Sequence, residues 1–236
     1  MVSIGKEINM TYFVSDIHGE YDLFMRLLKK IKFSEQDEMY VLGDIIDKGK
    51  YSVKLIKYIM QRPNIHCIIG NHEYSFLYEY YSLMENSPGD FSQVLRTLQK
   101  RFMDEDDDLT FDMIDWLECL PYYAEGEDFI AVHAGVPEGD DGALVSPADA
   151  PFELLIYDRR FKEPTYAPKC DKCVIFGHTP TVYVCGEPKV LAYKRKGRAG
   201  DKIKDFSKIH IDTDTWSSKV LGCLCKEKLT VTYVKG

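Results

Sequence analysis

The stretch VLGDIIDKGK (residues 41–50) places two carboxylates directly after an apolar run. Asp44 and Asp47 stand three positions apart, between Gly43 and Gly49, where the chain leaves a predicted buried strand. Two acids in such a place repel each other and are costly to desolvate unless a positive group lies beside them. The stretch therefore predicts a positive group at the end of this strand.

Polar residues follow other apolar runs of the chain in the same way. They are Asp16 and His18 in SDIHG, Asn71, His72 and Glu73 in GNHE, His133 in HAG, and His178 in GHTP. Four of the six histidines occupy such positions. Each residue alone is equally consistent with a helix cap or a hydrogen-bonded core side chain. Because open α/β sheets bind ligands at the carboxyl ends of their strands, the set together predicts one shared site.

Alternating strand and helix patterns predict an α/β fold. Apolar and β-branched runs predict strands at 10–15, 39–43, 65–70, 128–133, 173–177, 208–212 and 228–234. Apolar residues at helical spacing predict helices over 20–31 and 51–60. This order of strands and helices is typical of parallel strands joined by helical crossovers.

Two longer segments depart from this alternation. The segment 74–120, rich in Tyr, Leu and Met, predicts several helices packed on one side. The segment 179–202 predicts antiparallel strands plus a basic loop at 194–204. We expect that loop to be solvated, with a rim that attracts anionic substrates as the alternative. Because there is no internal repeat and no linker-like composition, a single domain over 1–236 is expected.

Composition limits the classes of function. The formal net charge of −8 disfavours general attraction to nucleic acid or to anionic membranes. No apolar run reaches the roughly 20 residues of a membrane span. The N-terminal MVSIGKEINM lacks the basic and apolar regions of a secretory signal, so a cytoplasmic protein is expected.

Cysteines and an acidic run are further candidates for metal binding. The seven cysteines, an odd number, favour reduced structural thiols. The pair Cys170 and Cys173, with Cys223 and Cys225, leaves a structural zinc site as the alternative. The run DEDDD (104–108) predicts a solvated loop or helix start, because the spacing and glycine of a calcium loop are absent.

The ligand chemistry of the strand-end residues predicts a metal pair. The six candidate ligands are Asp16, His18, Asp44, Asn71, His133 and His178. Carboxylate, amide oxygen and imidazole together suit Mn, Fe or Zn, with Mn expected first. Six ligands are too many for one catalytic ion that keeps an open position. They suit two ions that share one carboxylate, and Asp44 is the natural bridge.

These blocks in this order resemble the calcineurin-like metallophosphoesterases, specifically the phosphoprotein phosphatase branch in its bacterial and phage-like form. The blocks are DIHG, GDIIDKG, GNHE, VHAG and FGHTP, and they span residues 16–180. The resemblance implies a β-sandwich flanked by helices, with the metals at strand ends. It implies that Asp16, His18 and Asp44 bind the first ion. Asn71, His133 and His178, with Asp44 as the bridge, would bind the second.

The resemblance also assigns catalytic and substrate-binding roles. His72 would protonate the leaving group, and Asp47 would hold the ring of His72, with helix capping as the alternative for Asp47. Arg159 would grip phosphate, although a surface salt bridge is the alternative, and Arg160 is the neighbouring candidate. The sequence departs from the family pattern at Lys48 and Ile69, which stand where family members carry arginine. Lys48 would then offer substrate a point charge.

Three functions are compatible with these residues. The leading prediction is a serine/threonine protein phosphatase that hydrolyses phosphomonoesters by attack of a metal-bridging hydroxide. The GHTP block favours it over the alternative, a hydrolase of diadenosine tetraphosphate or a similar nucleotide. The third is an inactive metal-binding interaction module, which the complete ligand set disfavours. Expected partners are therefore a phosphorylated protein or a small phosphoester, with no nucleic acid and no membrane.

Overall fold

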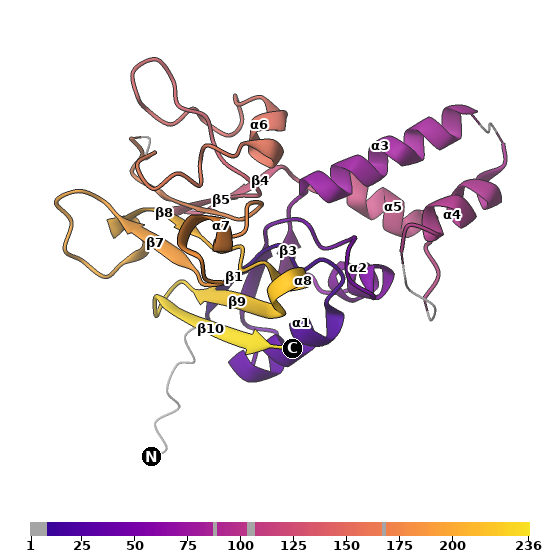
Figure 1. Cartoon of the computed structure of the whole chain (residues 1–236), viewed down its shortest axis with the longest axis horizontal. Coiled ribbons are helices and arrows are strands. Elements are labelled where there is room, and N and C mark those ends of the chain that lie inside the picture. The colour runs from indigo at the N-terminus through magenta and orange to yellow at the C-terminus, as the bar shows by residue number, and fades with distance from the viewer. Residues whose placement is uncertain (1–8, 87–88, 103–106, 167–168) are drawn as a thin grey trace.

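A computed structural model of the chain describes residues 9–86, 89–102, 107–166 and 169–236 (Figure 1). Its first sheet has the strand order β10-β9-β1-β2-β3. The strands are β1 (Thr11–Val14), β2 (Glu38–Val41), β3 (Ile65–Cys67), β9 (Val220–Cys225) and β10 (Thr230–Lys235). β1 pairs in parallel with β2, and β2 with β3, whereas β9 and β10 add antiparallel strands at the other edge.

The second sheet has the order β4-β5-β6-β8-β7. Its strands are β4 (Tyr123–Glu125), β5 (Phe129–Val132), β6 (Cys173–Phe176), β7 (Leu191–Lys194) and β8 (Phe206–His210). The three central strands β5, β6 and β8 are parallel, and the two edge strands are antiparallel to their neighbours. Both sheets thus have parallel strands whose carboxyl ends carry the predicted polar residues.

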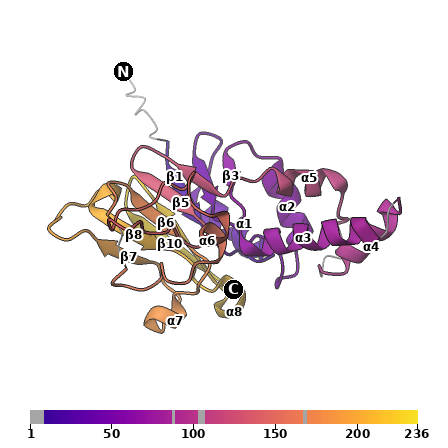
Figure 2. The same cartoon turned by 90° about the horizontal axis from the view of Figure 1, so that it is seen from above.

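Helices connect the strands and extend from the sheets. The longer helices are α1 (Tyr21–Ile31), α2 (Ser52–Met60), α3 (Asn71–Asn86), α4 (Phe91–Gln99), α5 (Phe111–Glu118) and α6 (Phe152–Tyr157). The short ones are α7 (Val182–Cys185), the 3-10 helix η1 (Ile203–Asp205) and α8 (Thr215–Ser218). Figures 1 and 2 both show α3, α4 and α5 extending away from the sheets as a helical arm. Described residues of the helix-rich segment predicted at 74–120 lie in this arm.

The two sheets pack face to face around alternating apolar side chains. Phe13 of β1 belongs to a buried cluster with Phe129 and Ile175 of the second sheet, and the rings of Phe13 and Phe129 lie 5.0 Å apart. Its neighbour Val14 joins the other buried cluster, which includes Phe24 of α1. Because successive strand residues point to opposite faces, β1 contributes to both layers. The fold is therefore the expected α/β arrangement, with two sheets and covering helices.

The predicted elements are found with adjusted ends, and two strands were missed. All seven strands predicted by residue range are present, but the segment 179–202 contains helix α7 and the single strand β7 in place of the expected antiparallel strands. The sequence patterns predicted neither the short strand β4 nor β9. The β9 sequence VLGCLC is buried along its whole length, yet Gly222 and two cysteines weaken the strand pattern. Helix α3 begins at Asn71 rather than after Glu73, so Asn71, His72 and Glu73 of the GNHE block already lie in the first helical turn.

The cysteines, the acidic run and the basic loop lie outside the site, and their described residues include free thiols and ordinary ion pairs. Groups of potential metal ligands among the described residues contain no cysteine, and the seven thiols are free. The acidic run lies partly outside the described residues, and its Asp107 pairs with Lys57 at 2.7 Å. In the basic loop, Lys194 pairs with Asp201 at 3.1 Å. No helix among the described residues has both the length and the apolar character needed to cross a membrane.

Candidate metal centre

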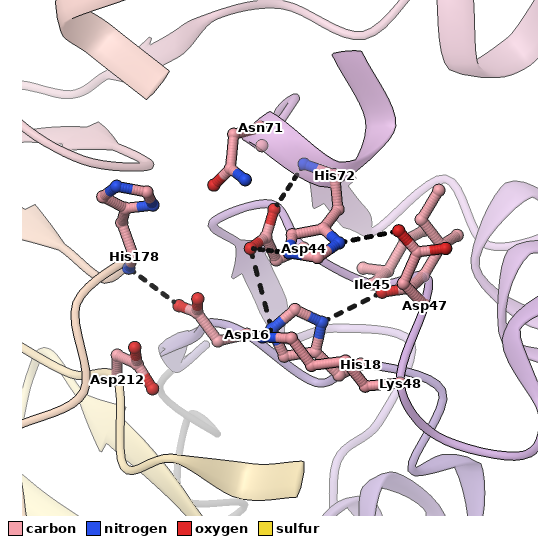
Figure 3. A network of polar contacts seen from close by, with 12 residues as sticks. Asp16, His18, Asp44, Ile45, Asp47, Lys48, Asn71, His72, His178 and Asp212 are labelled. Atoms are coloured by element: carbon pink, nitrogen blue, oxygen red, sulfur yellow. Dashed lines mark hydrogen bonds and ion pairs between the residues drawn. The ribbon is translucent and has the colours of Figure 1, made fainter. Parts of the chain in front are cut away.

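The predicted ligands converge where parallel strands of both sheets end (Figure 3). Asp16 and His18 follow β1, Asp44 follows β2, Asn71 begins α3, His133 follows β5 and His178 follows β6. Backbone hydrogen bonds hold these ends together, since the amide of Asp16 donates to the carbonyl of Gly43 at 3.2 Å. The amide of Gly177 donates to the carbonyl of His133 at 2.8 Å. Residues up to 162 positions apart, such as Asp16 and His178, are therefore direct neighbours.

The backbone of the site has an unusual conformation. Six of the ten described non-glycine residues with positive φ are Asp16, His18, Asp44, Asp47, Lys48 and His178, with φ between 48° and 69°. Such left-handed conformations are uncommon for side-chain-bearing residues and cluster at functional sites. Two glycines provide the necessary space. A Cβ atom on Gly70 would lie 2.3 Å from Oδ1 of Asp44, and one on Gly177 would lie 2.3 Å from Oδ2 of Asp16.

Asp44 lies between two groups of potential ligands. Its Oδ2 is 3.7 Å from Nε2 of His18 and 3.8 Å from Nε2 of His72. Its Oδ1 is 3.5 Å from Nε2 of His133. Within each group, His18–Asp44–His72 and Asp44–His133–His178, the ligand atoms lie within 4.8 Å of one another. Asp44 is thus the member shared by both groups, and each of its oxygens faces a different one.

The histidine rings present lone pairs to this carboxylate. Nδ1 of His133 lies 2.7 Å from the carbonyl oxygen of Leu42, and Nδ1 of His18 lies 2.9 Å from that of Ile46. Because a carbonyl oxygen only accepts, both Nδ1 atoms carry the proton and both Nε2 atoms keep a lone pair. Lone pairs that face a carboxylate are stabilised by a cation between them. Metal-binding histidines typically donate their other N–H to a carbonyl in this way.

The second group includes an unsatisfied nitrogen. Nε2 of His178 is buried and has no hydrogen-bond partner in the described part of the chain. Its Nδ1 lies 3.2 Å from Nε2 of His133, which is also 3.0 Å from Oδ1 of Asn71. Burial, together with the nearby His133, lowers the pKa of His178 to about 3, so the ring is neutral near pH 7. Neutral imidazole, carboxylate and amide oxygen form a donor set that fits a divalent cation.

The buried carboxylates of the site repel one another and would be stabilised by a positive charge. Burial raises the pKa of Asp44 well above its usual value, and the neighbouring Asp16 and Glu73 raise it further. Burial likewise raises the pKa of Asp212, with Asp16 again a neighbour. A divalent cation would offset this repulsion and keep the acids ionised. Asp212 was not singled out by the sequence analysis, although the stretch HIDTD contains it.

Asp16 is positioned differently from the other predicted ligands. It belongs to neither of the two groups within 4.8 Å. Its Oδ2 instead accepts a hydrogen bond from the amide of His178 at 3.0 Å. Figure 3 shows its side chain between His18 and Asp212 at the edge of the same cluster. The first group contains His72 where the sequence analysis expected Asp16.

Glu73 supports the loop that carries Asp44, a role that the sequence analysis did not assign. Its fully buried carboxylate accepts from the amides of Asp44 and Ile45 at 2.8 Å, and from that of Ile46 at 3.2 Å. It also accepts from the amide of Gly70 at 2.8 Å. One side chain therefore fixes the turn after β2 to the start of α3. The GNHE block contains Glu73, but only the fold shows which amides it binds.

His72, Asp47 and Arg101 form a hydrogen-bonded chain beside Asp44. Nδ1 of His72 lies 2.7 Å from Oδ2 of Asp47, as the resemblance implied. Burial would lower the pKa of His72, but the bond to Asp47 and the nearby Asp44 outweigh it and raise the pKa. Burial would raise the pKa of Asp47, yet Arg101 and His72 lower it to about 2. Arg101 was missed because it lies 54 positions from Asp47.

A pocket of about 320 Å³ opens onto the centre. Its lining residues are Asp44, Lys48, Asn71, His72, Arg159, His178, Pro180, Tyr183, Asp214, Trp216 and Ser217. Nζ of Lys48 lies 2.8 Å from Nε2 of His18. The neighbouring Arg160 is not a lining residue and pairs with Asp158 at 3.0 Å. Of the two adjacent arginines, Arg159 is therefore the one placed to meet an anion.

Lys208 supports the loop that carries Arg159. Its Nζ donates to the carbonyls of Phe161, Glu163 and Tyr166 at 2.6 Å each. The lysine is fully buried in β8, so this loop is fixed to the second sheet. No local pattern around Lys208 predicts such a role.

A family model, calcineurin-like phosphoesterase, matches residues 11–203. The chain belongs to this family. The match includes every predicted ligand and the residues of the hydrogen-bonded chain. The resemblance seen in the sequence blocks is thereby confirmed at the level of the superfamily, and family membership implies divalent metal ions.

Relatives with curated descriptions are named symmetrical bis(5′-nucleosyl)-tetraphosphatases. One from Aggregatibacter actinomycetemcomitans is 29% identical over 169 residues, covering 69% of this chain and 58% of its own length. One from Buchnera aphidicola of Schizaphis graminum is 33% identical over 129 residues, covering 53% and 44%. The chain thus spans about half the length of such relatives. The preference for the protein phosphatase branch is not supported by these matches, which agree with the alternative prediction.

Solved structures support the fold. A crystal structure of a protein provisionally described as a diadenosine tetraphosphatase superposes with a TM-score of 0.67, covering 99% of this chain and 96% of its own. Its sequence identity is 15%, so this match concerns the fold alone.

Proposed function

We propose that the chain is a metal-dependent hydrolase that cleaves the polyphosphate of a dinucleoside tetraphosphate. The observation that carries this proposal is the position of Asp44, whose two carboxylate oxygens face two different groups of histidines. The first cation would be held by Asp16, His18 and Asp44, and the second by Asp44, Asn71, His133 and His178. A bound cation pair supplies charge neutralisation of phosphate oxygens and a water of lowered pKa.

His72 is the proposed proton donor. Its Nδ1 bonds to Asp47 at 2.7 Å, which leaves Nε2 on the side of Asp44 and the pocket. A proton on Nε2 would pass to the oxygen of the departing group as the bond to phosphorus breaks. The bond to Asp47 stabilises the protonated ring before that step.

Arg159 and Lys48 are the proposed contacts to substrate. Both line the pocket beside His72 and Asp44, where a phosphate chain needs positive charge. The planar fork of Arg159 suits two oxygens of one phosphate, whereas Lys48 offers a single mobile charge. A polyphosphate with several negative groups would contact both Arg159 and Lys48 at once.

The choice of substrate is supported by the curated relatives, whose names describe tetraphosphatases. A phosphoprotein remains the competing substrate. Symmetrical cleavage of diadenosine tetraphosphate yields two molecules of ADP, whereas dephosphorylation of a phosphopeptide yields inorganic phosphate. Both substrates should be incubated with the chain and Mn²⁺, with and without a chelator, and the products separated by ion-exchange chromatography.

The proposal predicts ADP as the product and its loss with chelator. Faster release of phosphate from phosphoserine peptide would overturn the substrate. No hydrolysis of either compound by metal-loaded protein would overturn the enzymatic function itself. An Asp44→Asn variant prepared in parallel controls for contaminating hydrolases.

A further inference from the structure

Two exposed aromatic side chains line the same pocket as the predicted ligands. Tyr183 of α7 is 74% exposed, and Trp216 of α8 is 45% exposed. Figure 2 shows α7 and α8 on the same side of the molecule. Exposed apolar side chains that gather at one place on a surface often mark a binding site for a ligand.

The pocket has two chemically different parts. Arg159, Lys48 and His72 give one part positive or ligand-binding character, whereas Pro180, Tyr183 and Trp216 give the other part apolar walls. A nucleotide has the same two parts, an anionic phosphate chain and a flat aromatic base. Stacking on tryptophan and tyrosine is the usual way in which proteins hold a base without reading its identity.

We propose that Tyr183 and Trp216 form the subsite for a nucleobase of the substrate, with the phosphates lying toward Arg159. This inference rests on the proposed function, because it requires a nucleotide in the pocket. Trp216 is supported from its own helix end, since Nζ of Lys219 lies 5.9 Å from its ring and pairs with Glu20. This cation does not close the pocket, which the Trp216 side chain still lines.

The test compares a substrate that carries nucleobases with one that carries none. KM for diadenosine tetraphosphate and for inorganic tripolyphosphate should be measured for wild type, Trp216→Ala and Tyr183→Ala. Loss of stacking should raise KM for the dinucleotide about tenfold and leave the KM for tripolyphosphate unchanged. Tyr78→Ala is the matched control, because Tyr78 is also 74% exposed but does not line this pocket.

An equal KM for the dinucleotide in wild type and both variants would overturn the subsite. Binding of ADP, followed through the fluorescence of Trp216 in a Trp116→Phe background, separates this failure from failure of the proposed function. Quenching by ADP without dinucleotide hydrolysis would support the base subsite and overturn the proposed reaction. Absence of quenching would overturn the subsite even if hydrolysis occurs.

A second inference concerns Arg101, which follows α4 in the helical arm. Its Nε lies 2.8 Å from Oδ1 of Asp47, and its Nη2 lies 2.6 Å from Oδ2. The same Oδ2 bonds to His72. Nη1 of Arg101 binds Glu79 of α3 at 2.9 Å. The arm is therefore tied to the proposed proton donor through one bidentate ion pair.

A bidentate pair fixes the plane of a carboxylate as well as its position. Asp47 otherwise sits on a left-handed backbone with φ of 65°, with its side chain partly exposed. Without Arg101 the carboxylate is free to rotate, and the ring of His72 loses its single orientation. We infer that Arg101 is a positioning residue for His72, acting through Asp47. Because protonation assists a poor leaving group in any phosphoester, this inference does not depend on nucleotide specificity.

Arg101→Met should lower kcat about 10- to 100-fold, leaving KM and bound metal unchanged. The loss should be greatest for esters with poor leaving groups, which a purely structural defect would not produce. Arg101→Lys should restore part of kcat, because an ammonium still pairs with Asp47. Glu79→Gln is the control, since it removes only the arm-side contact.

Thermal unfolding shows whether the arm is intact. A variant with an unchanged Tm and wild-type kcat would overturn the inference. So would a loss of kcat that is equal for good and poor leaving groups.

Discussion

The floor and the wall of the pocket differ in how they are built. The floor is the cluster of Asp16, His18, Asp44, His133 and His178, of which Asp44 and His178 line the pocket and the other three are buried beside them. The wall consists of Pro180, Tyr183, Asp214, Trp216 and Ser217. Every floor residue is buried and follows a strand of one of the two sheets. Four of them have a left-handed backbone conformation, namely Asp16, His18, Asp44 and His178. Large wall residues are exposed and lie on two four-residue helices.

We expect this difference to separate the residues of the chemical step from those that select the substrate. A floor fixed by two sheets is organised before substrate arrives, as charge stabilisation of a reacting phosphate requires. A wall on short exposed helices can differ between relatives without disturbing the floor. Substitutions should therefore have effects that decrease from Asp44 in the floor, through His72 and Arg159, to Lys208, which supports the loop of Arg159.

The largest effect is expected for Asp44→Asn. The amide removes the charge that both groups of histidines face, so bound metal and kcat/KM should fall together, the latter about a thousandfold. Metal analysis and steady-state kinetics measure the two quantities. Asp22→Asn, on the exposed side of α1, is the control. Two retained metal ions per chain would contradict the bridging role of Asp44.

His72→Asn should reduce kcat about 100-fold while metal content stays at the wild-type level, since the variant loses the proton donor. Rates for a series of aryl and alkyl phosphoesters show where the loss lies. We expect the poorest leaving groups to suffer most. His66→Asn, on β3 outside the pocket, should have no such effect. A uniform loss across the series would remove His72 from proton transfer.

Arg159→Ala should raise KM about tenfold with little change in metal content, because it removes a bidentate contact to phosphate. Steady-state kinetics with a polyphosphate substrate measure the change. The adjacent Arg160→Ala is a close control, since that side chain pairs with Asp158 instead. Equal KM values in the two variants would show that Arg159 does not contact substrate.

The smallest kinetic effect is expected for Lys208→Met, which leaves three carbonyls of the Arg159 loop without their donor. KM should rise about threefold and Tm should fall by about 5 to 10 °C. Calorimetry and kinetics on the same sample test both. Lys204→Met, at an exposed position, is the control. A stable variant with an unchanged KM would show that the loop holds its shape without Lys208.

The sequence contains most of the floor but little of what supports it. Asp44 and His178 could be predicted, because parallel strands bring their carboxyl ends together and glycines mark the turns. Glu73 stands inside a recognised block, yet its partners are backbone amides that no side-chain pattern identifies. The positions of Arg101 and Trp216 depend on how the helical arm and helix α8 pack in the tertiary structure. Local spacing in the sequence does not reveal them.

Substrate preference could not be derived from the blocks either. The GHTP block belongs to the floor, through His178, and the floor serves any phosphate. The proposed base-binding residues Tyr183 and Trp216 stand on the wall, on two four-residue helices that are too short to show a periodic pattern. Under the proposed function, the sequence-based preference for a protein phosphatase used a block that does not report on specificity.

The most direct test of the account is anomalous diffraction from crystals grown with Mn²⁺. The account predicts two manganese peaks per chain, each within bonding distance of a different carboxylate oxygen of Asp44. His18 should lie at one peak, and His133 and His178 at the other. A single peak, or two peaks with Asp44 unbound, would contradict the shared-carboxylate centre.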